Sequence, residues 1–256
     1  MEIFDFHLHP GYDFHGNNTD PEHFVSLLKR DGITGCAGSV VDVDCTYKPL
    51  EEYEWRIPDL NRRAWEFHDA YPDFFAPGIH IHPDFMDMSC HEMELHKAKG
   101  GVLIGEIVFY MMDFQYNHKN ITELLHYAKE LDMVVNIHPS KGNPHYVRDM
   151  IDSVPGLQVV IAHLDGYGLY EDFISLMQKH ENVYADISAY GAERKGMLRD
   201  AVNRVGSQRI LYGTDFPGAV EDEEQRKYID YVLAENLDAA ATENIFFRNA
   251  KRLLRL

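Results

Sequence analysis

The sequence predicts an α/β fold in which eight parallel strands alternate with helices, a (β/α)8 TIM barrel, and three observations favour it. The chain has 256 residues, close to the roughly 250 residues typical of one such barrel. Short, β-rich apolar runs alternate with segments of helical period along its whole length. Runs such as Val159-Val160-Ile161-Ala162 are apolar on both faces, which is typical of parallel strands covered by helices.

Eight candidate strands can be counted from the N-terminus. They lie approximately at residues 3–9, 35–41, 74–81, 102–108, 133–139, 158–164, 183–188 and 209–215. No low-complexity stretch, Gly/Ser linker or duplicated block separates them. We therefore expect residues 1–256 to form a single domain.

Helix signals fill the segments between these strands. Asp20 is a suitable N-cap and Pro21 suits the first helical turn, after which apolar residues fall on one face. Residues 121–131 repeat the i, i+3, i+4, i+7 spacing, and a last helix is predicted at about residues 242–254. Residues 43–58 carry no strand pattern and are expected to form a long loop or an extra short helix.

Composition and charge exclude several classes of protein. With 45% hydrophobic and 26% charged residues, the chain can bury a substantial core, which excludes a largely disordered or fibrous protein. Its 24 Lys and Arg against 42 Asp and Glu give a net charge of −18. This charge repels nucleic-acid phosphates and anionic lipids, so neither nucleic acid nor a membrane is an expected partner.

The cysteines and the N-terminus indicate a cytoplasmic protein. Cys36, Cys45 and Cys90 are odd in number and lack a CxxC spacing, so neither a disulfide framework nor a zinc ribbon is expected. The first residues lack the basic and apolar regions of a secretion signal. No apolar run reaches the roughly 18 residues of a membrane span.

Residue types that bind metals recur at the ends of the predicted strands. His7 and His9 lie two apart on the first strand, so both side chains point to the same face at the barrel mouth. Alone, such a pair is a weak signal, because surface or turn histidines often show the same spacing. Four later strands also end in such residues: Glu106, His138, His163 and Asp215.

A shared divalent metal explains this set of residues. Burying a carboxylate or an unpaired imidazole costs several kcal/mol unless it is paired or coordinated. One or two ions bound by all six side chains would remove that cost. Four imidazoles and two carboxylates suit Zn²⁺ best, and Mn²⁺, Fe²⁺ and Ni²⁺ are compatible, because ligand type alone does not fix the metal.

The order of these residues resembles the amidohydrolase superfamily of metal-dependent hydrolases. Within it, four motifs are similar to the branch that also contains the aminocarboxymuconate-semialdehyde decarboxylases. They are Asp5-Phe6-His7-Leu8-His9, Ile161-Ala162-His163, Leu211-Tyr212-Gly213-Thr214-Asp215-Phe216-Pro217 and Asn249-Ala250-Lys251-Arg252-Leu253-Leu254. The resemblance spans the whole chain, and the combination of motifs is specific although each is weak alone.

Glu106 departs from the decarboxylase pattern. That branch generally holds one metal and has no ligand on the fourth strand, whereas a glutamate there is similar to the bridging carboxylate of two-metal TatD-like hydrolases. The resemblance then implies a first metal held by His7, His9 and Asp215, a bridging Glu106, and a second metal held by His138 and His163. Without a bridge, it implies one metal on His7, His9, His138 and Asp215, with His163 beside it.

The reaction implied first is hydrolysis of an ester, lactone, amide or phosphoester bond in a small molecule by a metal-activated hydroxide. Asp215 would carry the proton between water and leaving group. His163 would polarise the substrate oxygen if only one metal is present. Two alternatives stay open: non-oxidative decarboxylation of an unsaturated or aromatic acid, and a metal-binding scaffold without enzymatic activity.

Further side chains near the predicted barrel mouth are candidates for contacting the substrate. The pairs considered are His80 and His82, Tyr12 and His15, and Lys141 and Arg194. The two cations could anchor an anionic substrate. Solvated loop histidines, loop packing and solvated surface charge are the alternatives for the three pairs. The apolar run 109–112 fits a pocket wall or lid, and equally fits helix packing or a subunit contact, so a homo-oligomer is compatible with the sequence.

Overall fold

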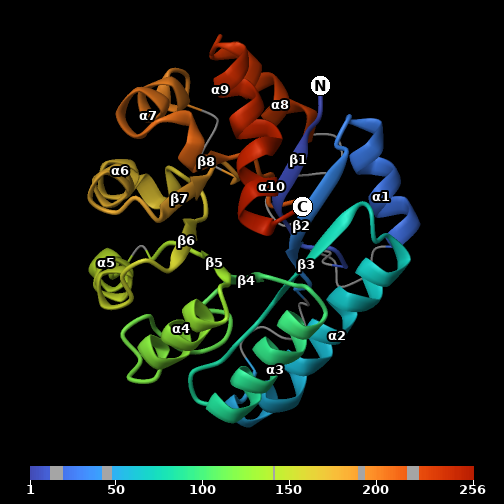
Figure 1. The fold of residues 1–256 in the computed structure, drawn as a ribbon, viewed down its shortest axis with the longest axis vertical. Coiled ribbons are helices and arrows are strands. Elements are labelled where there is room, and N and C mark those ends of the chain that lie inside the picture. The colour runs from blue at the N-terminus through green and yellow to red at the C-terminus, as the bar shows by residue number, and fades with distance from the viewer. Residues whose placement is uncertain (12–19, 42–47, 141, 190–193, 218–224) are drawn as a thin grey trace.

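The computed structural model describes residues 1–11, 20–41, 48–140, 142–189, 194–217 and 225–256. Eight parallel strands form one sheet in the order β1 to β8, with helices on its outside (Figure 1). The Phe6 N–H donates to the carbonyl of Tyr212 at 2.9 Å, and Leu8 forms a parallel bridge with Phe216. These contacts join the last strand to the first, so the fold is the predicted (β/α)8 TIM barrel.

All eight predicted strands are present, and each ends earlier than predicted. The strands are β1 (Phe4–Leu8), β2 (Gly35–Ser39), β3 (Phe75–Ile79), β4 (Leu103–Ile107), β5 (Val134–Ile137), β6 (Gln158–Ile161), β7 (Val183–Asp186) and β8 (Ile210–Leu211). The predicted polar strand ends therefore lie within the last residues of a strand or just beyond them.

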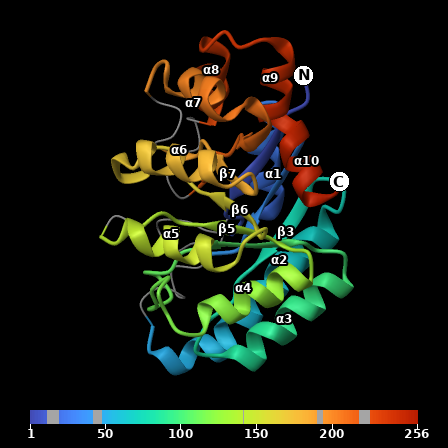
Figure 2. The same ribbon diagram turned by 60° about the vertical axis from the view of Figure 1, so that its left-hand side comes forward.

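The helices follow the strands in alternation (Figure 2). They are α1 (Pro21–Arg30), α2 (Tyr53–Ala70), α3 (Met86–Ala98), α4 (Ile121–Glu130), α5 (Pro144–Ser153), α6 (Tyr170–Lys179), α7 (Met197–Val205), α8 (Gln225–Ala234), α9 (Ala239–Glu243) and α10 (Asn249–Leu254). Short helices also occur: η2 (Leu50–Glu52), η3 (Gly166–Gly168), η5 (Ser207–Arg209) and the π-helix η6 (Asn244–Arg248).

Several helix predictions are confirmed. The Asp20 carboxylate accepts from the Glu22 N–H at 3.3 Å and caps α1. The predicted last helix begins earlier and contains the π-helical η6 between α9 and α10. Of the region 43–58, residues 43–47 lie outside the described residues, and the rest includes η2 and the start of α2.

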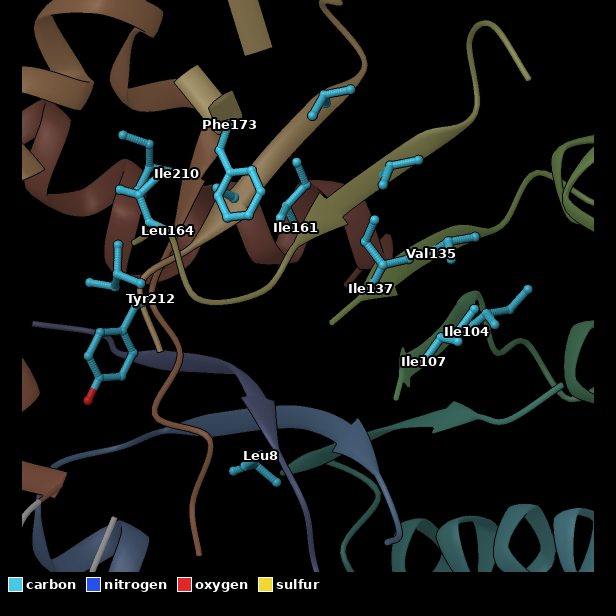
Figure 3. Packing of buried hydrophobic residues seen from close by; sticks show 14 of the residues in the cluster. Leu8, Ile104, Ile107, Val135, Ile137, Ile161, Leu164, Phe173, Ile210 and Tyr212 are labelled. Atoms are coloured by element: carbon cyan, nitrogen blue, oxygen red, sulfur yellow. The ribbon is translucent and has the colours of Figure 1, made fainter. Parts of the chain in front are cut away.

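Apolar side chains from neighbouring strands pack into a core. Figure 3 shows Ile104, Val135 and Ile161 on successive strands, with the ring of Phe173 from α6 near Ile161. A second cluster packs residues of α10 against Phe4, at the start of β1, and against residues of other strands. This packing covers the end of the barrel opposite the strand C-termini and leaves the C-terminal mouth for a site.

Two further sequence expectations can be compared with the fold. Cys36 and Cys90 are free thiols, while Cys45 lies outside the described residues. Across the part of the chain that the structure describes, every helix is too short or too polar to cross a membrane.

Candidate metal centre

The six predicted metal ligands lie together at the C-terminal mouth of the barrel. Their potential donor atoms form overlapping groups, and within each group all atoms lie within 4.8 Å of one another. The rings of His7 on β1 and His163 after β6 are stacked, with centroids 5.3 Å apart. The groups are His7, His9, Glu106 and Asp215; Glu106, His138 and His163; and His7, His163 and Asp186.

Two of these side chains lie where the hydrogen-bonded register between neighbouring strands is irregular. The β1–β2 register shifts between Asp5 and Leu8, and the β4–β5 register shifts between Ile104 and Ile107. His7 and Glu106 lie inside these two segments. Because a bulge bends a strand and redirects its side chains, such irregularities are over-represented beside active sites.

Two other members adopt a left-handed backbone conformation. His163 has φ 57° and Asp215 has φ 61°, which costs about 1–3 kcal/mol for a residue other than glycine. The Asp215 N–H donates to the His7 carbonyl at 2.8 Å, which secures this turn to β1. Non-glycine residues held this way concentrate at functional sites.

The first donor group has the spacing of a metal-binding site. His7 Nε2 lies 3.3 Å from His9 Nε2, 3.4 Å from Glu106 Oε2 and 3.6 Å from Asp215 Oδ1. His9 Nε2 lies 3.5 Å from Glu106 Oε2 and 3.2 Å from Asp215 Oδ1. Atoms bonded at 2.0–2.2 Å to one tetrahedral ion lie roughly 3.3–3.6 Å apart. These residues therefore fit a small divalent cation.

The other oxygen of Glu106 faces the second donor group. Glu106 Oε1 lies 2.9 Å from His138 Nδ1 and 3.5 Å from His163 Nε2. One carboxylate thus presents each of its oxygens to a different pair of imidazoles. This is the arrangement that a bridging ligand requires, although the shorter distance is also that of an ordinary hydrogen bond.

The electrostatics of the cluster favour a cation. Burial lowers the pKa of His9, but hydrogen bonds with Asp215 and Glu106 outweigh burial and raise it to about 9. Burial raises the pKa of Glu106, but the neighbouring His7 and His138 hold it well below its usual range. The carboxylates thus draw protons onto the imidazoles, and a bound metal would replace those protons with its own charge.

Asp186 at the end of β7 is a functional residue that the sequence interpretation missed. It is fully buried, and its Oδ2 accepts from His7 Nδ1 at 3.0 Å and from Asn136 Nδ2 at 3.2 Å. Burial raises its pKa, but His7 brings it down to about 2. Its signal in the sequence is the same as that of the predicted ligands, a carboxylate ending an apolar strand.

Asp5 is a second buried carboxylate without a predicted role. It accepts from the His7 N–H at 3.1 Å and from the Thr214 hydroxyl at 2.7 Å. Burial raises its pKa to about 7, opposed by the hydrogen bond from Thr214. Asp5 therefore joins β1 to the segment that carries Asp215.

The histidines predicted at the end of β3 are buried. His80 is 1% exposed; its Nε2 donates to the Val40 carbonyl at 2.9 Å, and within the described part of the chain its Nδ1 has no hydrogen-bond partner. Burial lowers its pKa to about 4. In His82, Nε2 donates to the Met112 carbonyl at 2.7 Å and Nδ1 accepts from the Asp84 N–H at 3.2 Å. Both ring nitrogens of His82 are thus used within the protein, whereas His80 keeps a free acceptor.

Of the remaining predicted substrate contacts, only Arg194 lies among the described residues, and the contacts it makes there are with residues outside the cluster. Arg194 is more than half exposed, lies 3.4 Å from Asp165 and stacks over Tyr170. Tyr12, His15 and Lys141 lie outside the described residues.

Two tyrosines that the sequence interpretation missed border His138. The Tyr167 hydroxyl lies 3.0 Å from His138 Nε2, and the Tyr110 ring centroid lies 5.2 Å from that of His138. Tyr167 is 45% exposed, so it lies between the cluster and solvent. No local pattern marks these tyrosines, because their role depends on contacts between successive barrel loops.

This barrel with histidine, glutamate and aspartate donors at its mouth defines a metal-dependent enzyme of the amidohydrolase type. The chain belongs to the amidohydrolase family, whose model matches residues 4–256, as its motifs predict. No curated protein matches the chain significantly.

Three solved structures with named activities share the fold over nearly the whole chain. They are a 2,6-dihydroxybenzoate decarboxylase from Rhizobium (17% identity, TM-score 0.74, covering 99% of this chain and 98% of that one), the 5-carboxyvanillate decarboxylase from Sphingomonas paucimobilis (12%, 0.73, 100% and 98%) and a dihydroxybenzoic acid decarboxylase from Polaromonas with bound manganese and 2-nitroresorcinol (15%, 0.74, 100% and 97%).

These comparisons correct the expected reaction. The sequence interpretation ranked hydrolysis first because a bridging Glu106 suggested a two-metal hydroxide. The three similar structures described above are decarboxylases, so the prediction of a hydrolase was wrong and its alternative is favoured. The error arose because hydrolases and decarboxylases of one fold share ligand types, and a ligand set does not encode the reaction.

Proposed function

We propose that the chain is a metal-dependent, non-oxidative decarboxylase of a small aromatic acid. The proposal rests on one combined observation: a barrel similar to known decarboxylases carries a cluster of potential metal ligands at its mouth. The barrel is similar over its full length to decarboxylases of dihydroxybenzoates and 5-carboxyvanillate. At its mouth, where barrel enzymes place their active sites, lies the buried cluster of His, Glu and Asp donors.

His7, His9, Glu106 and Asp215 would hold the cation, since the separations of their donor atoms fit one ion. His138 and His163 would complete a second position with the other oxygen of Glu106. A bound divalent cation supplies positive charge that orients the anionic substrate in a protein of net charge −18. Mn²⁺ is the first ion to test because the similar Polaromonas enzyme contains it, and Zn²⁺ is the second.

Asp215 would deliver the proton that replaces the carboxylate. Its side chain is 15% exposed, whereas those of His7 and Glu106 are 1% and 3% exposed, so it is the carboxylate of the cluster that can reach substrate. A proton moves from its carboxyl group to the ring carbon that bears the substrate carboxylate. The C–C bond then breaks, its electron pair returns to the ring, CO₂ leaves, and solvent reprotonates Asp215.

His163 would support this transfer. Its Nε2 lies 4.0 Å from Asp215 Oδ2, and nearby carboxylates raise its pKa even though burial opposes them. His163 Nε2 therefore lies beside the carboxylate that Asp215 becomes after losing its proton. Tyr167 and Tyr110 at the rim would offer ring faces and a hydroxyl to an aromatic substrate.

The test is CO₂ release from 2,6-dihydroxybenzoate, 5-carboxyvanillate and related aromatic acids. Protein loaded with Mn²⁺, loaded with Zn²⁺ or treated with chelator is compared, with the product identified by chromatography. We expect turnover only in the loaded forms. Asp215→Asn should lower kcat by about 10²–10⁴-fold, and the exposed Asp172→Asn on α6 should behave as the native chain.

Two outcomes would contradict the proposal. Hydrolysis of esters, lactones or amides without CO₂ release from any acid would remove the decarboxylase function. No substrate-dependent chemistry, together with tight metal binding, would favour the metal-binding scaffold. Metal content is measured for Asp215→Asn as well, because loss of metal and loss of proton delivery must be separated.

We further propose that residues 1–256 form one domain, because a single sheet begins at Phe4 and the last helix ends at Leu254. A small-molecule substrate is the proposed partner. The cytoplasmic location and a homo-oligomeric state stay predictions.

A further inference from the structure

A continuous chain of buried contacts joins two metal-facing histidines from different strands through Asp186. Asp186 Oδ2 accepts from His7 Nδ1 at 3.0 Å. Asp186 Oδ1 makes a short contact with the Ser188 hydroxyl, and that hydroxyl lies 2.8 Å from His163 Nδ1. Asp186 and Ser188 are both 0% exposed, so bulk water does not compete for these bonds.

Hydrogen-bond counting fixes where the protons lie. The backbone N–H groups of His163 and Ser188 also donate to Asp186 Oδ1, at 3.1 and 3.0 Å. A carboxylate surrounded by donors acts as an acceptor. The single hydroxyl proton of Ser188 therefore points to Asp186, and the hydroxyl oxygen accepts from His163. His163 Nδ1 must then carry a proton, as His7 Nδ1 does.

The ring nitrogens left over are those that face the metal site. With a proton on Nδ1, the Nε2 lone pairs of the neutral imidazoles are free. His7 Nε2 lies among the first donor group and His163 Nε2 lies 3.5 Å from Glu106 Oε1. The hydrogen bond made by one ring nitrogen determines which nitrogen a metal can use.

We propose that Asp186 is a positioning residue that fixes the Nδ1–H tautomer of two metal-facing imidazoles, His7 directly and His163 through the Ser188 hydroxyl. This inference rests on the proposed metal centre and deepens it. The Asp186 carboxylate on β7 thus fixes the tautomer of one histidine in each donor group, His7 in the first and His163 in the second. Ser188 also lies 3.1 Å from His7 Nδ1, but its proton is already given to Asp186, so it can only accept there.

The arrangement predicts different effects for two substitutions. Ser188→Ala removes the link to His163 and leaves the bond between Asp186 and His7. Asp186→Asn disturbs both imidazoles, because an amide can offer a donor where the carboxylate accepts. Ser188→Thr keeps a hydroxyl and should restore the native pattern. Ser39→Ala is the matched control, since it removes a buried hydroxyl that has no hydrogen-bond partner among the described residues.

The measurement is ¹⁵N NMR of the histidine rings in metal-free protein, at a pH where the imidazoles are neutral. We expect Nδ1–H for His7 and His163 in the native chain and in Ser39→Ala. In Ser188→Ala only His163 should shift toward Nε2–H, and in Asp186→Asn both should shift. Zn²⁺ affinity, measured by competition with a chelator, should fall about 10-fold in Ser188→Ala and 10–100-fold in Asp186→Asn.

The inference is overturned if His163 keeps its native tautomer in Ser188→Ala, or if His7 changes there as much as His163. If Asp186→Asn does not fold, the comparison of Ser188→Ala with Ser188→Thr decides. No substrate or bound metal enters the NMR measurement. An NMR result that contradicts this inference is therefore distinguishable from a failure of the proposed decarboxylation.

Discussion

His7 is the residue with most contacts in the candidate centre. Its Nε2 lies within 3.6 Å of His9, Glu106 and Asp215, while its Nδ1 donates to Asp186 at 3.0 Å. A ligand held on both sides in this way loses little freedom when it binds an ion, which raises affinity. Truncating His7 removes a donor and also leaves Asp186 without one of its partners.

We predict that His7→Ala loses most of the bound metal. Native protein purified without any chelator should carry one to two equivalents of transition metal. The variant should bind the metal at least about 10-fold more weakly. Elemental analysis measures the content. His91→Ala, an exposed histidine on α3, is the control and should match the native value. Equal metal content in His7→Ala would place the ion elsewhere.

At the scale of elements, the apolar strands and their polar ends could be predicted from sequence. Each strand is a local run of apolar residues, and Glu106 ends such a run as visibly as His138 does. The register shifts between β1 and β2 and between β4 and β5 could not be predicted, since they depend on pairing with neighbouring strands. Nor could the contact of His7 with Asp186, which are 179 residues apart in the chain.

The strand lengths also combine a feature that the sequence predicts, the apolar run, with one that it does not, the residue at which the strand ends. The apolar pattern continues through 164 and 215, whereas β6 ends at Ile161 and β8 at Leu211. Regular pairing with the neighbouring strands does not continue beyond these ends, because His163 and Asp215 adopt positive φ values. Hydrogen bonds such as Asp215 N–H to the His7 carbonyl hold that conformation, and only the folded barrel supplies them.

The backbones of β1 and β2 approach each other closely at Gly38, and this contact leads to a prediction about stability. A Cβ on Gly38 would lie 1.7 Å from the Leu8 carbonyl oxygen, a backbone atom that cannot yield. Gly38→Ala should therefore lower the free energy of unfolding by at least about 1–3 kcal/mol. Gly142→Ala is the control, because its Cβ would meet nothing within 4 Å. Urea denaturation compares the two, and equal midpoints would contradict the expectation.

For the whole molecule, the candidate centre is a junction between distant parts of the barrel. The six predicted ligands come from the ends of β1, β4, β5, β6 and β8, so only the closed barrel brings them together. The unfolded chain has no such site. The acidic composition also makes the folded state repel itself, and a divalent cation at the mouth offsets part of that repulsion.

Metal removal should therefore lower the stability of the fold. An ion that binds only the native state stabilises it by about 2.7 kcal/mol at a free concentration 100 times Kd, which corresponds to a rise in Tm of roughly 5–10 °C for a chain of this size. Calorimetry of chelated protein with and without added Mn²⁺ measures the shift. In His7→Ala the rise should largely disappear, because the donor group is broken. A rise of the same size in that variant would mean that the stabilising ion binds the acidic surface instead of the barrel mouth.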